Sequence, residues 1–137
     1  MFADVPTSCV FENTEDGNFA VNYVLSHDDG LTWGERGRIY TPAAGKAAGS
    51  PQVALVGGTL VASFMTNEDG GSASDTAVDG GSMKTVGSTD GGITWSGATT
   101  VSPVGSHWGG VFATNDRTFL TMVAIDGTGL QAHSWNV

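Results

Sequence analysis

The sequence predicts an all-β fold, and three observations support this prediction. Its apolar runs are short, rich in valine, threonine and phenylalanine, and bounded by glycine, asparagine, aspartate and serine, which is typical of strands joined by turns. No apolar stripe with helical spacing persists beyond about ten residues without a glycine. An eight-residue motif occurs twice, which predicts repeated structural units. We therefore expect antiparallel strands arranged in hairpins.

Ten strands are expected along the chain, in three groups. Residues 7–41 supply three strands, residues 50–103 supply four and residues 109–137 supply three. A four-stranded antiparallel unit that recurs along a chain is typical of a β-propeller blade, so residues 1–137 should form a partial β-propeller of about two and a half blades. The expected strands are Ser8–Phe11, Phe19–Ser26, Gly37–Tyr40, Pro51–Val56, Thr59–Met65, Ser82–Ser88, Thr99–Ser102, Gly110–Thr114, Phe119–Ala124 and Gly129–Asn136.

The repeated motif has the pattern S-x-D-x-G-x-T-W, and its two copies are 62 residues apart. In such a turn the aspartate accepts backbone N–H groups, and the glycine two positions later adopts a positive φ. The tryptophan is expected to pack beneath the turn. Because the carboxylate oxygens are occupied in the turn, we interpret both aspartates as structural. The motif residues are Ser26, Asp28, Gly30, Thr32 and Trp33, and then Ser88, Asp90, Gly92, Thr94 and Trp95.

This motif resembles the Asp-box of sialidases and other BNR-repeat proteins, where it joins the third and fourth strands of a propeller blade. Further stretches resemble the C-terminal half of glycoside hydrolase family 93, which comprises secreted, fungal-type exo-arabinanases built on a six-bladed sialidase-like β-propeller. The resemblance implies an extracellular glycosidase that acts on a neutral plant polysaccharide such as α-1,5-arabinan through a retaining mechanism with two carboxylates. It covers nearly the whole chain but only about half of such an enzyme. The stretches are residues 10–12, 36–40, 48–53, 57–66, 101–103 and 106–108.

About two and a half blades cannot close a ring, because a propeller needs at least about four blades. We therefore expect this chain to be part of a longer protein, or to need a partner that closes it. Alone, it is expected to be inactive and to self-associate through its open blade edges. The apolar residues expected on the open faces include Val10, Phe11, Phe119 and Met122.

The direction of the strands predicts which residues share one end of the molecule. Successive strands of a blade alternate in direction, so both Asp-box turns and the Gly57-Gly58 turn are expected at one end. In the sialidase-like enzymes the active site lies at the opposite end. The polar residues expected there are Glu12, as a catalytic group, and Asn67, Glu68, Asp69, His107 and Trp108, as substrate-binding groups.

Glu12 is the strongest catalytic candidate. It directly follows an apolar strand, at a position where the second repeat has Met65, and a carboxylate at an otherwise apolar position needs an explanation. The resemblance supplies one, because the Val-Phe-Glu sequence that ends at Glu12 matches the position of one catalytic carboxylate of the family. The second carboxylate is expected outside this chain. A solvated glutamate at a strand end is the alternative interpretation.

The other candidates also have structural alternatives. Glu68 and Asp69 either bind sugar hydroxyls or lie in a solvated loop, and Trp108 either stacks on a sugar ring or packs between blades. His27 lies inside an Asp-box and His133 on the last strand, and we interpret both as structural. No pair of histidines or acids has the spacing of metal ligands, so neither a metal nor another cofactor is expected.

Composition and charge limit the partners and the alternatives. Acidic residues outnumber basic residues by 14 to 5, and the net charge of −9 argues against nucleic acid or an anionic membrane as a partner. For the oligosaccharide or polysaccharide substrate that the resemblance implies, this charge suits a neutral glycan better than an anionic one. Cys9 is the only cysteine, which excludes a disulfide within the chain. A sialidase is the main enzyme alternative, but it needs three converging arginines, and Arg36 and Arg38 share one peripheral strand. A non-catalytic carbohydrate-binding propeller is the other alternative.

Overall fold

The computed structural model describes residues 6–14, 19–73 and 78–137, and within these ranges every regular element is a β-strand. None of these residues belongs to a helix that could cross a membrane. The strands are β1 (Thr7–Asn13), β2 (Ala20–Ser26), β3 (Arg36–Tyr40), β4 (Ala48–Val56), β5 (Thr59–Thr66), β6 (Ser72–Ala73), β7 (Val78–Asp79), β8 (Ser82–Ser88), β9 (Thr99–Thr100), β10 (Ser106–Ala113), β11 (Thr118–Ile125) and β12 (Gly129–Asn136).

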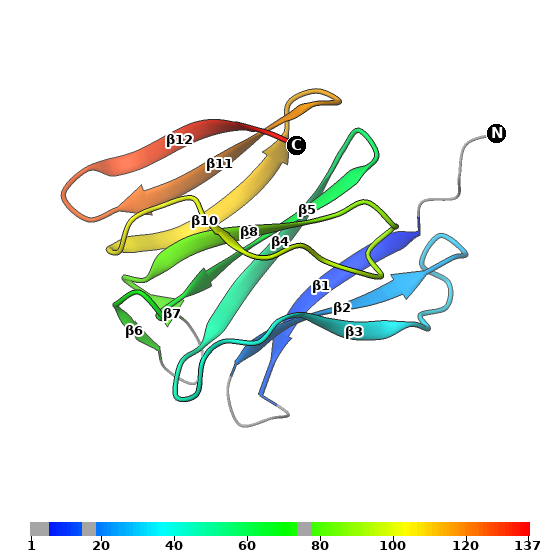
Figure 1. Ribbon diagram of the computed structural model, residues 1–137, viewed down its shortest axis with the longest axis horizontal. Coiled ribbons are helices and arrows are strands. Elements are labelled where there is room, and N and C mark those ends of the chain that lie inside the picture. The colour runs from blue at the N-terminus through cyan, green and yellow to red at the C-terminus, as the bar shows by residue number, and fades with distance from the viewer. Residues whose placement is uncertain (1–5, 15–18, 74–77) are drawn as a thin grey trace.

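The strands form three larger antiparallel sheets and one small hairpin (Figure 1). The first sheet has the order β1-β2-β3, the central sheet β4-β5-β8-β9 and the third sheet β10-β11-β12. The two-residue strands β6 and β7 pair with each other in the connection between β5 and β8. The strands of each larger sheet follow one another in sequence order, so the three groups of strands along the chain are also three groups in space.

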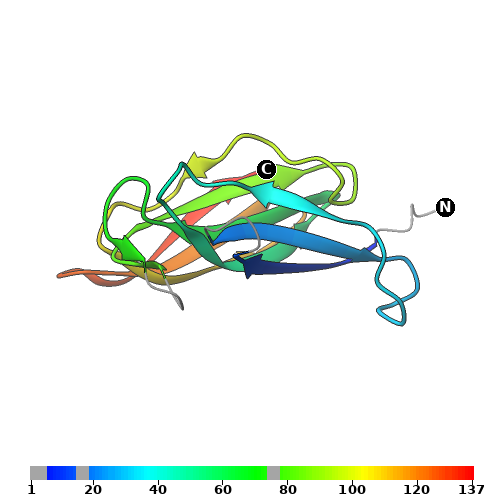
Figure 2. The ribbon, with the colours of Figure 1, turned by 90° about the horizontal axis from the view of Figure 1, so that it is seen from below.

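The central sheet has another sheet packed on each of its faces, and Figures 1 and 2 show the three sheets from two directions. On one face, Phe64 belongs to a core cluster with Tyr23 and Leu25 of the first sheet. On the other face, Met65 belongs to a cluster with Val123 of the third sheet. Because both faces are covered, seven of the eight residues of β5 are buried and the strand shows no alternation of buried and exposed positions.

The turns gather at two ends of the molecule, which we call the Asp-box end and the opposite end. At the Asp-box end, the β4–β5 turn approaches the β10–β11 turn so closely that a Cβ on Gly57 would lie 2.4 Å from the carbonyl oxygen of Asp116. At the opposite end, the Ser106 N–H at the start of β10 donates to the Gly81 carbonyl at 2.9 Å. The candidate site lies at this opposite end, where β4 and β10 begin.

Each of the ten expected strands has a counterpart, but three differences bear on the site. β4 begins at Ala48 and β10 at Ser106, both earlier than expected, because each strand starts with an irregular segment before its regular pairing. His107 and Trp108 therefore belong to a strand. The loop expected between the strands that end at Ser102 and begin at Gly110 is present only up to residue 105, and its placement over residues 106–109 is wrong. The connection over residues 70–81 contains the β6–β7 hairpin, which the sequence does not reveal.

The expectation that Val10 and Phe119 lie on open faces is also wrong. Val10 packs against the core between the first and central sheets, and Phe119 is buried between the central and third sheets. Successive side chains of a strand point to opposite faces, so Phe11 points away from the central sheet, and Met122 points away from it for the same reason. The outer faces thus carry one set of apolar residues and the inner core another.

Candidate functional site

The two Asp-box turns share the hydrogen bonds that the serine and the threonine of the motif donate to the aspartate. Asp28 Oδ1 accepts the Thr32 N–H at 2.8 Å, and Asp90 Oδ1 accepts the Thr94 N–H at 2.9 Å. The serine that begins each motif donates its hydroxyl to the same carboxylate at 2.8 Å. These bonds, and the bond from the threonine hydroxyl above all, lower the pKa of both aspartates to about 2. Both carboxylates are thus occupied within their own turns.

The glycines and tryptophans of the two turns behave less uniformly. Gly30 has a φ of +86° and Gly92 a φ of +96°, a conformation that glycine adopts without strain. Trp95 Nε1 donates to the Gly92 carbonyl at 3.0 Å, and its ring packs against the core between the first and central sheets. Trp33 remains 45% exposed. The expected packing of the ring beneath the turn therefore describes Trp95 well and Trp33 only in part.

At the opposite end, the first strand of the central sheet and the first strand of the third sheet share an irregularity. β4 shifts register around Ser50, which has a φ of +53°, and β10 shifts register around Trp108, which has a φ of +44°. A positive φ is uncommon for both residue types, and such strain gathers at functional sites. β-Bulges similarly occur next to active sites, where they redirect side chains. The two bulges single out this end as the candidate site.

The two bulged strands lie side by side. A Cβ on Gly110 of β10 would lie 2.5 Å from Gln52 Oε1 of β4, so the Gln52 side chain lies directly on the backbone of the neighbouring strand. Both residues come two positions after the strained residue of their own bulge, which places the two bulges at the same level. The site is therefore built from two adjacent and equivalent strand starts.

Glu12 lies between the first sheet and the central sheet at this end. Its Oε2 accepts the N–H of Ser50, the strained residue of the β4 bulge. The two sheets meet closely here, because a Cβ on Gly49 would lie 2.3 Å from the same oxygen. The carboxylate is half-buried and held by a backbone donor, so it differs from the freely solvated glutamate of the alternative interpretation.

The repeat shows how unusual this carboxylate is. In the central sheet, the position equivalent to Glu12 is occupied by Met65. Met65 is only 1% exposed and packs in the core between the central and third sheets. The same position thus carries a buried thioether in one sheet and a carboxylate in the other. Bringing a carboxylate out of water is unfavourable unless it is hydrogen-bonded, which the Ser50 N–H accomplishes.

Asn67 and Glu68 are engaged within the protein. Asn67 Oδ1 accepts the Ala47 N–H at 2.8 Å. The Glu68 carboxylate accepts the Tyr40 hydroxyl and lies 3.6 Å from Lys84 Nζ. Burial acts to raise the pKa of Glu68, but the hydrogen bond from Tyr40 and the charge of Lys84 outweigh it and lower that pKa. Burial, together with the Glu68 carboxylate, raises the pKa of Tyr40. These contacts brace the end of the sheets.

Asp69 is the more accessible of the two adjacent acids. Its Oδ2 accepts the Ser82 hydroxyl at 2.7 Å and lies 3.4 Å from Lys84 Nζ. The hydroxyl, and secondarily the lysine, lower the pKa of Asp69. Its side chain is 44% exposed, against 15% for Glu68, so Asp69 retains carboxylate surface that a sugar hydroxyl can reach.

His107 joins two carboxylates that the sequence does not single out. Its Nδ1 contacts Asp79 Oδ1, and its Nε2 lies 3.0 Å from Asp126 Oδ1, although that N–H is not aligned for a hydrogen bond. The interaction with the Asp126 carboxylate, and secondarily that with Asp79, raises the pKa of His107, because both carboxylates favour the protonated ring. The side chains of Asp79 and Asp126 are 65% and 74% exposed, so the cluster presents acceptor oxygens to solvent.

Trp108 follows His107 and is 73% exposed. Packing between the sheets of this chain therefore does not account for it. An exposed indole ring beside polar groups is suited to stacking on the apolar face of a sugar ring.

Sequence analysis did not identify Ser50, Asp79 and Asp126 as site residues. Each of them stands beside a proline or a glycine, where serine and aspartate are typical of ordinary turns.

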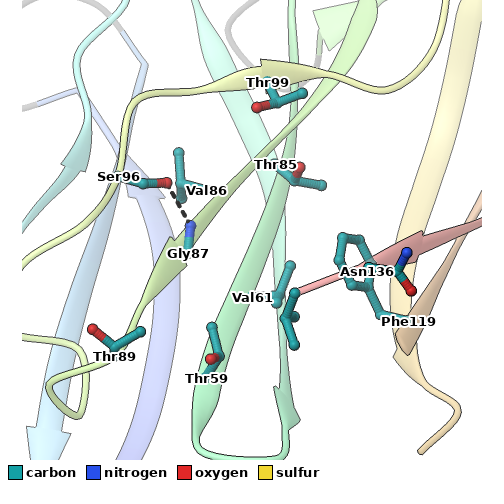
Figure 3. A pocket seen from close by; sticks show the side chains of 11 residues that line it. Thr59, Val61, Thr85, Val86, Gly87, Thr89, Ser96, Thr99, Phe119 and Asn136 are labelled. Atoms are coloured by element: carbon teal, nitrogen blue, oxygen red, sulfur yellow. Dashed lines mark hydrogen bonds between the residues drawn. The ribbon is translucent and has the colours of Figure 1, made fainter. Parts of the chain in front are cut away.

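A groove of about 250 Å³ lies elsewhere, between the central and third sheets (Figure 3). Its lining includes Thr59, Thr85 and the ring of Phe119, and the Gly87 N–H there donates to the Ser96 hydroxyl at 2.9 Å. None of its lining side chains is ionisable, so it offers no acid–base chemistry.

Among the residues that the structure describes, no group of histidine, cysteine and acidic side chains could hold a metal ion.

Comparison with known proteins supports the fold. No protein-family model and no curated protein matches the sequence. Among solved structures, the chain is similar to a protein of unknown function from Dyadobacter fermentans, with a TM-score of 0.68 at 18% sequence identity. The similarity covers 94% of this chain and 34% of the other, so this chain spans about a third of the length of the structure that it matches. At this identity the likeness shows an all-β fold with antiparallel sheets, and it carries no information about activity.

Proposed function

We propose that this chain is part of a six-bladed, sialidase-like Asp-box β-propeller that acts as an extracellular exo-glycosidase on a neutral plant polysaccharide such as α-1,5-arabinan. In this proposal, the first sheet is a partial blade, the central sheet a full blade and the third sheet another partial blade. Glu12 is one of the two carboxylates of a retaining mechanism, which lie about 5–5.5 Å apart in such enzymes. The second carboxylate belongs to another part of the propeller.

The observation that carries the proposal is the placement of the Glu12 carboxylate. It lies at the end opposite the Asp-boxes, where the repeat otherwise buries Met65, and it is held by the N–H of a strained bulge residue. A carboxylate fixed in this way is oriented before a substrate arrives, which is what a catalytic group requires. The net charge of −9 further favours a neutral polysaccharide over an anionic one.

The arginines do not favour a sialidase. Arg36 and Arg38 lie on β3 of the first sheet, whereas Arg117 lies in the β10–β11 turn of the third sheet. The central sheet separates these two locations. Recognition of a sialic acid carboxylate by three arginines needs all three guanidinium groups around one point, which these positions do not provide.

The test is the hydrolysis of linear arabinan by the full-length gene product carrying Glu12→Gln. The glutamine retains an oxygen that can accept the Ser50 N–H, so the fold should survive while the catalytic carboxylate is lost. We expect turnover to fall at least about a hundredfold. The matched control is Glu35→Gln, which removes an exposed carboxylate next to His27 at the Asp-box end and should leave turnover unchanged. Retention of more than about a tenth of the turnover would contradict the role of Glu12.

A non-catalytic carbohydrate-binding protein is the second candidate, and the exposure of Trp108 favours it. Its test is the titration of the 137-residue chain with arabino-oligosaccharides, followed by NMR. Binding that Trp108→Ala abolishes and that Leu31→Ala, at another exposed apolar residue, leaves intact would support this candidate. If the full-length product also failed to hydrolyse arabinan, this candidate would replace the glycosidase. The absence of binding to any neutral oligosaccharide would exclude it.

A further inference from the structure

The ring of His107 has more partners than one protonation state can satisfy, and we propose that this histidine is a proton-dependent switch at the opposite end of the molecule. With a proton on both nitrogens, the ring joins Asp79 of β7 to Asp126 of the β11–β12 turn. With a single proton, its Nδ1 accepts the Gly80 N–H instead, and Asp79 is released. The switch is a property of this chain and does not depend on the proposed catalytic role of Glu12.

Two groups compete for the Nδ1 atom of His107. The Asp79 carboxylate contacts this nitrogen, and the Gly80 N–H donates to it at 3.3 Å. An ionised carboxylate can accept a hydrogen bond from Nδ1 only when the nitrogen carries a proton, whereas an N–H can donate to Nδ1 only when the nitrogen has a free lone pair. The two bonds therefore need opposite states of one atom, and only one of them forms at a time.

The other ring nitrogen determines which proton is lost. Nε2 of His107 is shielded from solvent and has no aligned hydrogen bond, and the nearest carboxylate oxygen, Asp126 Oδ1, lies 3.0 Å from it. A proton on Nε2 faces this carboxylate favourably, whereas a bare lone pair there would face a negative charge. Nε2 therefore keeps its proton, and the proton that leaves at higher pH comes from Nδ1.

The two carboxylates are the charged groups that act on the ring in the described part of the chain. Of the strands packed against β10, β4, β5 and β11 carry no ionisable side chain, β7 carries Asp79, and β8 carries Lys84. The Nζ of Lys84 lies 3.4 Å from Asp69 Oδ2, so these two charges pair with each other. The interaction with Asp126, and secondarily that with Asp79, raises the pKa of His107.

Backbone hydrogen bonds hold the surrounding segments in either state of the switch. The Gly105 N–H donates to the Gly80 carbonyl at 2.8 Å, and the Asp126 N–H donates to the Gly105 carbonyl at 2.9 Å. Gly105 thus joins both segments through groups that do not titrate. Loss of a proton from His107 therefore changes side-chain contacts and leaves the fold intact.

The state of His107 decides whether the Asp79 carboxylate is available to a ligand. The Asp79 side chain is 65% exposed, and it contacts the residue that directly precedes the exposed Trp108. Below the pKa of His107 the imidazolium occupies this carboxylate. As the pH rises through that raised pKa the ion pair is lost, and the carboxylate becomes free to accept hydrogen bonds.

The test is ¹⁵N NMR of the purified chain between about pH 5 and about pH 9, because the shifts of the two imidazole nitrogens distinguish the protonated ring from each neutral tautomer. The signals of His107 are identified by their loss in His107→Gln. We expect a protonated ring at low pH and the Nε2–H tautomer at high pH, with the Gly80 amide signal following the same titration. A neutral ring with its proton on Nδ1, or a Gly80 signal that does not follow the titration, would overturn the proposal.

Removal of each carboxylate separates its contribution. Asp79→Asn and Asp126→Asn should each lower the pKa of His107, and Asp126→Asn should also reduce the share of the Nε2–H tautomer. The matched control is Asp116→Asn, which removes an exposed acid at the Asp-box end and should change neither the pKa nor the tautomer. A tautomer ratio that Asp126→Asn leaves unchanged would overturn the proposal, and circular dichroism would verify that each variant is folded.

Discussion

A double-mutant cycle on Glu12 and Gly49 tests whether these two residues fix the start of β4. Glu12→Ala removes the oxygen that accepts the Ser50 N–H. Gly49→Ala places a Cβ 2.3 Å from Glu12 Oε2, and the three atoms nearest to that Cβ all belong to the Glu12 carboxylate. The φ of Gly49 lies outside the left-handed region, so alanine can adopt the backbone conformation. The flexible carboxylate must therefore move, and both substitutions break the same hydrogen bond.

The expected magnitudes follow from that shared bond. A hydrogen bond to a charged group contributes about 1.5–3 kcal/mol, and the half-buried Glu12 should lie near the lower limit, so Glu12→Ala should lower the free energy of unfolding by about 1.5 kcal/mol. Gly49→Ala breaks the same hydrogen bond, but alanine also restricts the unfolded chain, which raises the free energy of unfolding by about 0.5 kcal/mol. The net effect of Gly49→Ala is therefore to lower the free energy of unfolding by about 1 kcal/mol. In the Glu12→Ala background, Gly49→Ala should instead stabilise by about 0.5 kcal/mol. The coupling is then about 1.5 kcal/mol.

Urea denaturation of the four proteins measures this coupling, at one protein concentration because association would alter the apparent stability. With a slope of about 1.5 kcal/mol per M, Glu12→Ala should lower the midpoint by about 1 M urea. Additive effects of the two substitutions would refute the reasoning. They would mean that Glu12 and Gly49 are not coupled in solution, so Gly49→Ala does not act through the hydrogen bond between the Ser50 N–H and Glu12, and other contacts set the β4 bulge.

Two further predictions concern the tryptophans of the Asp-boxes and the histidine of the opposite end. Trp95→Ala should lower the free energy of unfolding by about 3 kcal/mol, and Trp33→Ala by only about 1 kcal/mol, because Trp95 packs on the core whereas Trp33 is 45% exposed. Thermal melts of the two variants measure this difference in stability. Equal losses of stability would contradict the prediction. His107 has a raised pKa, so its contribution to stability is present below its ordinary pKa of about 6.5 and is lost as the pH rises through the higher folded value. Asp126→Asn should lower the pKa of His107 in an NMR titration, and an unchanged pKa would show that Asp79 alone accounts for the shift.

Local interactions explain what the sequence could predict. The bonds of the first Asp-box join Asp28 to Ser26 and Thr32, which lie within four residues of it, so the motif contains its own geometry. The strands are equally readable, because a turn signal bounds each apolar run. The end of the molecule at which Glu12 would lie follows from strand direction alone.

Contacts between distant segments explain what the sequence could not predict. The positive φ of Ser50 belongs to a bulge that meets Glu12, 38 residues earlier in the chain. Glu68 reads as a solvated turn residue, yet the Tyr40 hydroxyl, 28 residues earlier, donates to its carboxylate. His107 meets Asp79 across 28 residues, through a two-stranded hairpin that no periodicity reveals. Such pairs become apparent only when the sheets are stacked.

The burial of β5 on both faces has a consequence for how freely this sequence can change. A strand at the surface tolerates most substitutions of its outward-facing residues. In β5, by contrast, seven of the eight positions are buried, and neither Ala62 nor Phe64 is in contact with solvent. By contrast, six of the eight residues of β12 are exposed. Substitutions on β5 should therefore be tolerated less well than substitutions on β12.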